Sequence, residues 1–223
     1  MAVNDRPVPR TQPLRDRGLM HYGEIHVAEI LDEAVACHVG YVRDGQPQVQ
    51  PMTHVRVGDR LYLHGSTGSR MMLTAGRAGL DVCVVATLID AYVLARSSFN
   101  HTVNYRCAVV HGRGVPVEDQ DRKSQVFRAL LDKIADGRSA DCRSPAKREL
   151  AQTAMLSLPL TEASVRIQSG GVADEPEDLA LPCWAGIVPL RTTAGPPAAD
   201  VDERLVPLPG YLRDMVGGAT HGA

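Results

Sequence analysis

The residues best suited to chemistry are gathered in one short turn, residues 64–70, which reads HGSTGSR. The apolar segment LYL precedes it and helix-forming residues follow, so the turn is expected to join a strand to a helix. Backbone N–H groups of a glycine-rich turn can converge on an anion, and a helix N-terminus adds partial positive charge. Hydroxyl groups and a guanidinium, which can bind phosphate through two nitrogens, complete the set of donors. These side chains belong to Ser66, Thr67, Ser69 and Arg70.

The same turn also has a simpler interpretation. Ser69 can cap the following helix while Arg70 lies in solvent, which would leave a plain strand-to-helix connection. The turn is not a Walker A loop, because it lacks the Gly-Lys-Ser/Thr ending, and G-x-G-x-x-G with its βαβ unit is absent. Residue types alone therefore leave an anion site and a plain connection as alternatives.

The elements that would position this turn follow from hydrophobic periodicity. Asp44-Gly45 is the pattern of a two-residue hairpin turn between two strands. The sequence predicts helices over 26–34, 69–75 and 118–135, and strands over 36–42, 48–57, 60–64, 81–88, 91–96, 104–113, 156–160, 165–168 and 184–190.

Short connections between these strands favour antiparallel pairing, since parallel strands need longer crossovers. Six or more strands, one long helix and several short ones predict a mainly β (α+β) fold, an antiparallel split β-barrel with peripheral helices. The Pro/Arg-rich residues 1–20 are expected to form an N-terminal arm, and residues 21–191 the barrel domain. Residues 192–223, rich in Ala, Pro and Gly, are expected to be a loosely held tail.

Composition narrows the class of protein. The 223 residues carry a formal net charge of −2 and are 44% hydrophobic, which indicates a globular chain without a global attraction for nucleic acid or anionic membrane. Five cysteines without a C-x-x-C pair, and no clustered histidines, indicate free thiols and no metal site. No apolar stretch approaches the length of ~20 residues that a membrane-spanning helix needs. The sequence also shows no secretory signal, so a cytoplasmic protein is expected.

Three segments in this order resemble the pyridoxamine 5′-phosphate oxidase-like split-barrel flavoproteins. They are LYLHGSTGSR at 61–70, ARSSFNHTVNYR at 95–106 followed by Gly112, and WAGIVPL at 184–190. The resemblance is strongest to the flavin-nucleotide-binding branch that includes the nitroimidazole-resistance reductases, and it covers roughly residues 22 to 190. It implies a homodimer with FMN bound at the interface between the subunits.

The resemblance also implies site residues. Ser69 and Arg70 match the pair that binds the FMN phosphate, with Ser66 and Thr67 beside them. Met71 stands where the oxidases have a lysine. The remaining residues implied to approach the flavin are Gln50, Met52 and Thr53 on one strand, His64 and Gly65 at the end of the next, and Trp184, which the second subunit would contribute.

A polar loop supplies the candidate for proton transfer. His101 could protonate a substrate beside the flavin, because imidazole titrates near neutral pH, and it could equally make a plain surface hydrogen bond. Asn104 and Tyr105 open the next strand and could meet the flavin edge or the substrate, although Tyr105 could equally be a half-buried strand residue. Cys107 stands where the oxidases have glutamine, and the Arg-x-x-Pro that grips pyridoxine phosphate is missing. Pyridoxamine phosphate oxidation is therefore not expected.

These features predict an FMN-dependent oxidoreductase that acts on a small aromatic or nitro compound at a flavin in the dimer interface. NADH or NADPH would supply the electrons, or reduced flavin would arrive by exchange, and no nucleic acid or membrane partner is expected. Three alternatives stay open at this point: a flavin carrier without turnover, a protein that holds heme in the same barrel, and a specialised biosynthetic flavoenzyme. Heme or a deazaflavin are the cofactors that would replace FMN.

Overall fold

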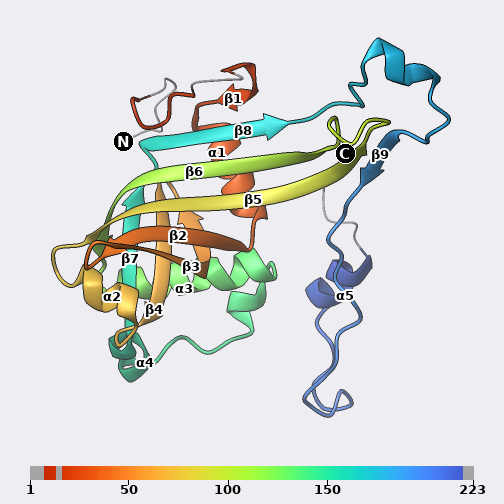
Figure 1. The fold of residues 1–223 in the computed structure, drawn as a ribbon. Coiled ribbons are helices and arrows are strands. Elements are labelled where there is room, and N and C mark those ends of the chain that lie inside the picture. The colour runs from red at the N-terminus through yellow and green to blue at the C-terminus, as the bar shows by residue number, and fades with distance from the viewer. Residues whose placement is uncertain (1–7, 14–16, 218–223) are drawn as a thin grey trace.

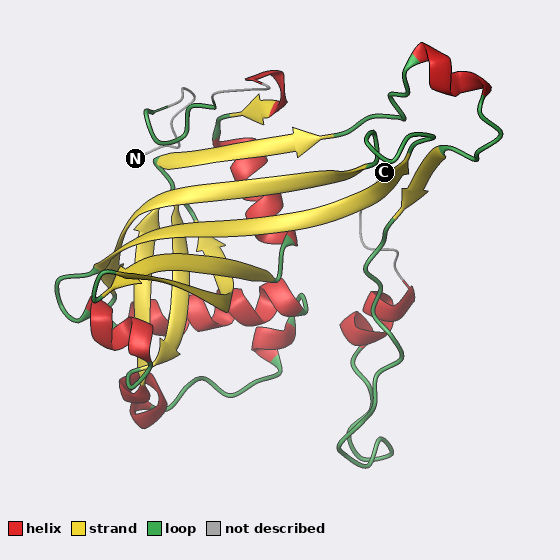
Figure 2. Cartoon of the chain, viewed as in Figure 1, coloured by secondary structure: helices red, strands yellow, loops and turns green. Residues whose placement is uncertain are grey.

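The computed structural model describes residues 8–13 and 17–217 of a mainly β chain (Figure 2). Parts of the predicted arm (1–7, 14–16) and of the predicted tail (218–223) lie outside the described residues. Within those described, the strands are β1 (Met20–His21), β2 (Ala36–Arg43), β3 (Gln46–Val57), β4 (Arg60–Ser66), β5 (Leu80–Leu94), β6 (Thr102–Pro116), β7 (Thr153–Pro159), β8 (Glu162–Gln168) and β9 (Gly186–Pro189). The helices are α1 (Glu24–Glu33), α2 (Arg70–Ala75), α3 (Gln120–Ile134), α4 (Lys147–Gln152) and α5 (Gly210–Gly217).

Six of these strands close into a hydrogen-bonded ring in the order β2–β3–β4–β7–β6–β5, and every pairing in it is antiparallel. Strand β6 pairs with β5 along most of its length, with β8 in its first half and with β7 at its end. The sheet therefore divides at β6, with β8 and β1 beyond the ring on one side and β9 added to the far end of β5 (Figure 1). The predicted antiparallel split barrel with peripheral helices is confirmed.

Turn chemistry sets the geometry of the first hairpin. Asp44 and Gly45 have φ values of 51° and 73°, so both central residues of the turn between β2 and β3 are left-handed. Glycine and, less readily, aspartate tolerate this conformation, and its twist matches that of the flanking strands. The predicted two-residue turn is confirmed.

Strand β5 contains both predicted segments, 81–88 and its continuation from residue 91, and it also includes Ile89 and Asp90, which the prediction left between them. It is one continuous strand with a bulge between Ile89 and Ala91. The bulged Asp90 binds Arg106 on β6, whose Nη2 lies 2.8 Å from Asp90 Oδ1. The same guanidinium also contacts Glu33 at the end of α1. A polar residue that looked like a strand break is thus held by a partner on the neighbouring strand.

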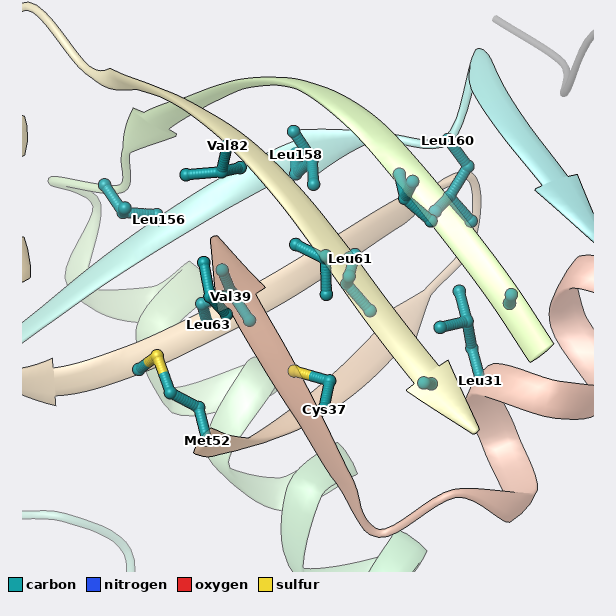
Figure 3. Packing of buried hydrophobic residues seen from close by; sticks show 14 of the residues in the cluster. Leu31, Cys37, Val39, Met52, Leu61, Leu63, Val82, Leu156, Leu158 and Leu160 are labelled. Atoms are coloured by element: carbon teal, nitrogen blue, oxygen red, sulfur yellow. The ribbon is translucent and has the colours of Figure 1, made fainter. Parts of the chain in front are cut away.

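The main core fills the barrel. Inward-facing residues alternate along each strand, as in Cys37 and Val39 of β2 and Leu61 and Leu63 of β4 (Figure 3). A second, smaller core lies outside the ring, where α3 covers β3, β4 and β7. Its buried members are Val55, Tyr62, Val126, Leu130 and Met155.

Lys133 joins α3 to two other elements at one end of the barrel. Its Nζ donates hydrogen bonds to the carbonyl oxygens of Leu31, Ala34 and His54, at 2.7, 2.8 and 3.0 Å. Burial lowers the pKa of Lys133 to about 8. Burial and the nearby charge of Lys133 lower the pKa of the fully buried His54 to about 4. This lysine therefore ties the last turn of α1 and strand β3 to the helix that covers them.

The two ends of the described chain both contact the body of the fold. Near the N-terminus, the Tyr22 hydroxyl donates to the carbonyl of Thr11 at 2.9 Å. Beyond β9 an irregular segment with a turn at residues 203–205 leads to α5 (Figure 2), a helix that composition did not predict. There the Tyr211 hydroxyl donates to Asp141 Oδ2 at 2.8 Å.

Candidate functional site

The turn identified from the sequence lies between β4 and α2. Ser69 is the N-cap of α2, and its Oγ accepts a hydrogen bond from the backbone N–H of Met72 at 3.4 Å. Gly65 and Ser66 are the last residues of β4. The strand, turn and helix are thus arranged as the sequence predicts, and the capping role of Ser69 is confirmed.

The backbone N–H groups of the turn are occupied within the protein. The N–H of Thr67 donates to the carbonyl of Gln152 at 3.0 Å, and that of Ser69 to the carbonyl of Ser66 at 2.9 Å. The N–H of Gly68 donates to Ser66 Oγ at 3.2 Å. Helix α2 has only six residues, so its dipole is small. An anion at this turn would therefore be bound mainly by side chains rather than by the backbone cradle that residue types suggested.

Arg70 is the cation of the turn. Its side chain is exposed, and among the described residues its guanidinium has no hydrogen-bond or ion-pair partner. It lies at a cleft of about 670 Å³ between α2 and the turn that follows β2. The next residue, Met71, is completely buried in the barrel core, so it offers nothing to a ligand in this cleft.

The predicted residues on β3 and β4 divide between the two faces of the barrel wall. Gln50 and Met52 pair with Val39 and Cys37, whose side chains point into the barrel, and Met52 is itself buried there (Figure 3). Thr53 lies between the buried residues Met52 and His54, and side chains alternate along a strand, so Thr53 lies on the outer face. Strand β3 therefore presents its backbone and Thr53, rather than Met52, to a ligand outside the barrel.

His64 lies on the outer face near α3, with its ring edge-on to Phe127 at a centroid distance of 5.7 Å. Burial lowers the pKa of His64 below its usual value, so the ring is neutral at neutral pH. A neutral imidazole can donate or accept one hydrogen bond without adding charge.

The second group of predicted residues surrounds the start of β6. His101 Nδ1 lies 2.9 Å from the carbonyl oxygen of Ser97. Asn104 Nδ2 donates to the carbonyl of Gly170 at 3.0 Å, and Tyr105 pairs with Ile89 on β5. Trp184 precedes β9, which pairs with residues 91–94 of β5 at this same end.

The two groups lie at opposite ends of β6. The turn 65–70 contacts the start of β7, whose Leu156 pairs with Pro116 at the end of β6. His101 and Asn104 lie at the start of that strand, which has 15 residues and a contour of roughly 45 Å. Figure 1 shows α2 at one end of the barrel and β9 at the other. One copy of the chain therefore does not bring the predicted residues together.

Comparison with known proteins identifies the family. The family model for pyridoxamine 5′-phosphate oxidase matches residues 24–167. The chain belongs to this family. None of the curated proteins matches the chain.

Two solved structures in this family cover nearly the whole chain. The flavocytochrome Anf3 of Azotobacter vinelandii is 33% identical over 95% of this chain and 99% of its own, with a TM-score of 0.86. An FAD- and heme-binding protein of Mycobacterium smegmatis is 36% identical over 89% of this chain and 97% of its own, with a TM-score of 0.82. A Bacteroides thetaiotaomicron protein assigned to 5-nitroimidazole antibiotic resistance shares the fold, at 20% identity over 63% of this chain and 81% of its own, with a TM-score of 0.54.

The structure adds residues that the sequence did not indicate. Arg43 and Asp44 line the cleft beside Arg70, together with Leu73 and Thr74 of α2. Only the fold brings the β2–β3 turn to α2.

Within the described ranges, no group of three or more His, Cys, Asp or Glu side chains could hold a metal ion. In the same ranges, no helix is long and apolar enough to span a membrane.

Proposed function

We propose that this protein binds a flavin nucleotide at the turn between β4 and α2 and acts as a flavin-dependent oxidoreductase. The observation that carries the proposal is Arg70, an exposed arginine without a partner among the described residues, at the edge of a 670 Å³ cleft. Membership of the pyridoxamine 5′-phosphate oxidase family supports it. So does the likeness, over nearly the whole chain, to a flavocytochrome and to a protein that binds FAD and heme.

The donors at the turn fit a flavin phosphate. The Arg70 guanidinium can donate two parallel hydrogen bonds to phosphate oxygens, and the hydroxyls of Ser66, Thr67 and Ser69 can each donate one more. The outer faces of β3 and β4 lie next to the turn, so Thr53 and the neutral His64 orient the ring system. A bound flavin supplies one- and two-electron transfer, and the protein supplies its anchor and the exclusion of water. The cofactor domain is proposed to span residues 21–191.

A homodimer is proposed because the two groups of candidate residues are far apart in one chain. A two-fold axis would bring His101, Asn104 and Trp184 of one subunit to the turn of the other. Exposed apolar residues support this arrangement, since Trp184 is 67% exposed and Leu205, in a turn of the C-terminal segment, is 81% exposed. A contiguous patch of such side chains would mark an interaction surface, and a dimer interface would cover it.

The dimer has a direct test. Light scattering at micromolar concentration is expected to give a mass close to twice 24.1 kDa. Deleting residues 192–223 is expected to shift the mass toward one chain while the circular dichroism of the barrel is unchanged. A single-chain mass for the intact protein with flavin bound would contradict the dimer.

The substrate proposed is a small aromatic or nitro compound, with NADH or NADPH as the electron donor, in the cytoplasm, where the five free cysteines stay reduced. The purified protein is expected to show the two visible absorption bands of a flavin. Bleaching by NADH or NADPH, followed by recovery when an acceptor is added, would establish turnover. Flavin bands that neither nucleotide bleaches would leave a carrier, and a protein that binds no flavin would contradict the proposal.

A second candidate function is heme binding in addition to flavin. Because His101 Nδ1 is held by the carbonyl of Ser97, Nε2 is left to face outward, which is how a protein orients a histidine ligand of a metal. The neighbouring Phe99 is 92% exposed and offers an apolar surface to a porphyrin. In this role His101 would hold the heme iron rather than act as the proton donor predicted from the sequence.

Spectroscopy tests this ligand. The protein loaded with heme is expected to show a Soret band that weakens and shifts in His101→Ala. The band is expected to be unchanged in His38→Ala, which removes an exposed histidine on β2. The reverse pattern, or no heme uptake by the wild type, would exclude His101 as the ligand.

A further inference from the structure

One carboxylate at the β9 end of the molecule is almost completely buried. Asp174 lies in the connection between β8 and β9 (residues 169–185), and its side chain is 1% exposed. Its Oδ1 accepts a hydrogen bond from the backbone N–H of Arg96 at 2.9 Å, and its Oδ2 accepts one from Arg96 Nη1 at 2.7 Å. A buried carboxylate is destabilising unless it is paired in this way. The pair of contacts therefore fixes where Arg96 lies relative to the connection.

Arg96 depends on this carboxylate in turn. Its side chain is 26% exposed, and its Nε is buried without a hydrogen-bond partner in the part of the chain that the structure describes. In that same part, Asp174 is the acceptor for both the backbone N–H and the guanidinium of Arg96. Removing the carboxylate would leave a backbone donor and a partly buried cation without an acceptor, so the segment around Arg96 would be free to move.

Arg96 belongs to the β5–β6 turn (residues 95–101), which ends at His101. The next residue after Arg96 is Ser97, whose carbonyl oxygen lies 2.9 Å from His101 Nδ1. A carbonyl oxygen can only accept, so Nδ1 carries the proton and Nε2 of the neutral ring keeps its free electron pair. The Ser97 carbonyl therefore selects the tautomer of His101, and Asp174 holds the residue before that carbonyl.

The same carboxylate lies on the segment that leads to Trp184. A second contact joins this segment to β6, because Asn104 Nδ2 donates to the carbonyl of Gly170 at 3.0 Å. Figure 1 shows the β8–β9 connection and the β5–β6 turn at the same end of the molecule, beside β9. Asp174 thus joins the two segments that carry His101 and Trp184.

We propose that Asp174 is a positioning residue for the cofactor site. By binding Arg96 it fixes the β5–β6 turn against the β8–β9 connection, which selects the His101 tautomer and sets where Trp184 lies. Asp174 acts through these two residues and does not itself contact a cofactor. The inference rests on the proposed function in one respect, the placement of His101 and Trp184 at the cofactor.

Nitrogen NMR of the histidine rings tests the effect on His101. The full-length protein is measured without cofactor at a pH of about 8, where an ordinary imidazole is neutral, and the His101 signals are identified by their loss in His101→Ala. The wild type is expected to carry the proton mainly on Nδ1, and Asp174→Ala is expected to carry it mainly on Nε2. Asp174→Asn keeps an acceptor for the Arg96 N–H without the charge, so it is expected to fall between them.

Trp184 provides a second measurement, since it is the single tryptophan of the chain. Its fluorescence anisotropy in the cofactor-free protein is expected to fall in Asp174→Ala. The double variant Arg96→Ala/Asp174→Ala is expected to lose no more than either single variant, because the two residues act through one contact. Glu177→Ala is the matched control for both measurements, since Glu177 is an exposed carboxylate in the same connection, and it is expected to match the wild type.

Heme uptake relates this contact to the site. Asp174→Ala is expected to weaken heme binding by about tenfold, the lower end of the effect of groups that orient a metal ligand. In a His101→Ala background, Asp174→Ala is expected to weaken it no further, because Asp174 acts through that histidine. An equal loss in both backgrounds would show a merely structural role and overturn the inference.

An unchanged tautomer of His101 or an unchanged anisotropy of Trp184 in Asp174→Ala would also overturn the inference, and flavin binding by the wild type would then leave the proposed function standing. If Asp174→Ala does not fold, Asp174→Asn decides by the same comparisons. Failure of the wild type to bind flavin or heme would instead overturn the corresponding proposed function, while the two cofactor-free measurements would still decide whether Asp174 positions His101.

Discussion

Replacing Lys133 with methionine is expected to lower the free energy of unfolding by about 2–3 kcal/mol. Methionine has a similar volume but cannot donate, so the carbonyls of Ala34 and His54 lose a charged donor in a buried environment. The carbonyl of Leu31 keeps its contact with His54 Nε2 at 2.9 Å. Part of the loss is offset, because a buried ammonium is itself costly, as its lowered pKa of about 8 indicates.

Urea unfolding measures this effect as a lower midpoint with an unchanged slope. Lys147→Met is the matched control, since Lys147 is exposed at the start of α4 and the same substitution there is expected to change stability by less than about 0.5 kcal/mol. Equal shifts for the two variants would show that the three carbonyl contacts of Lys133 contribute nothing.

Replacing Arg70 with alanine is expected to weaken the binding of flavin nucleotide by about ten- to a hundred-fold, with little effect on unfolding. A hydrogen bond to a charged group contributes about 1.5–3 kcal/mol, which corresponds to that range. The effect is large because the N–H groups of Thr67, Gly68 and Ser69 are already bonded within the protein and Met71 is buried. Arg70→Lys is expected to recover part of the affinity, since it keeps the charge but loses the planar two-nitrogen geometry.

Isothermal titration with FMN and with riboflavin distinguishes phosphate binding from general damage. Riboflavin lacks the phosphate, so its affinity is expected to be the same in the wild type and in Arg70→Ala. Arg77→Ala removes an exposed arginine just after α2 and is expected to bind both ligands as the wild type does. If Arg70→Ala weakened riboflavin and FMN alike, or if the wild type bound both equally, the turn would be no phosphate site.

The sequence predicted most of the strands and the ring that they form, because hydrophobic alternation and the Asp44-Gly45 turn are local signals. The sequence pattern placed an interruption at Ile89-Asp90 within this strand, because the partner that holds the Asp90 carboxylate, Arg106, lies on another strand. Helix α4 was not predicted, because, unlike the equally short α2 with Ser69 before it and Gly76 after it, it begins after an alanine and ends at a threonine, which are not typical capping residues at those ends. Its N-terminus depends instead on the Glu149 side chain, which accepts from the N–H of Ala146 at 2.8 Å.

The candidate site was predicted only in part, because only its local features are visible in the sequence. The donors of the turn 64–70 are contiguous, so residue types alone pointed to them. The engagement of the Thr67 N–H could not be predicted, because its acceptor is the carbonyl of Gln152, 85 positions later in the chain. The contribution of Arg43 was missed because only the closed barrel brings the β2–β3 turn to α2.

The three partners of β6 restrict how a protein of this shape can change in length during evolution. Its residues are in register with β5 from Thr102 to Gly114, with β8 from Tyr105 to His111, and with β7 at its end. Because side chains alternate between faces, inserting or deleting one residue in β6 would turn inward-facing groups outward against several neighbours at once. Descendants of this sequence are therefore expected to gain or lose residues in the connections at 135–146 and 169–185, where no strand would be displaced.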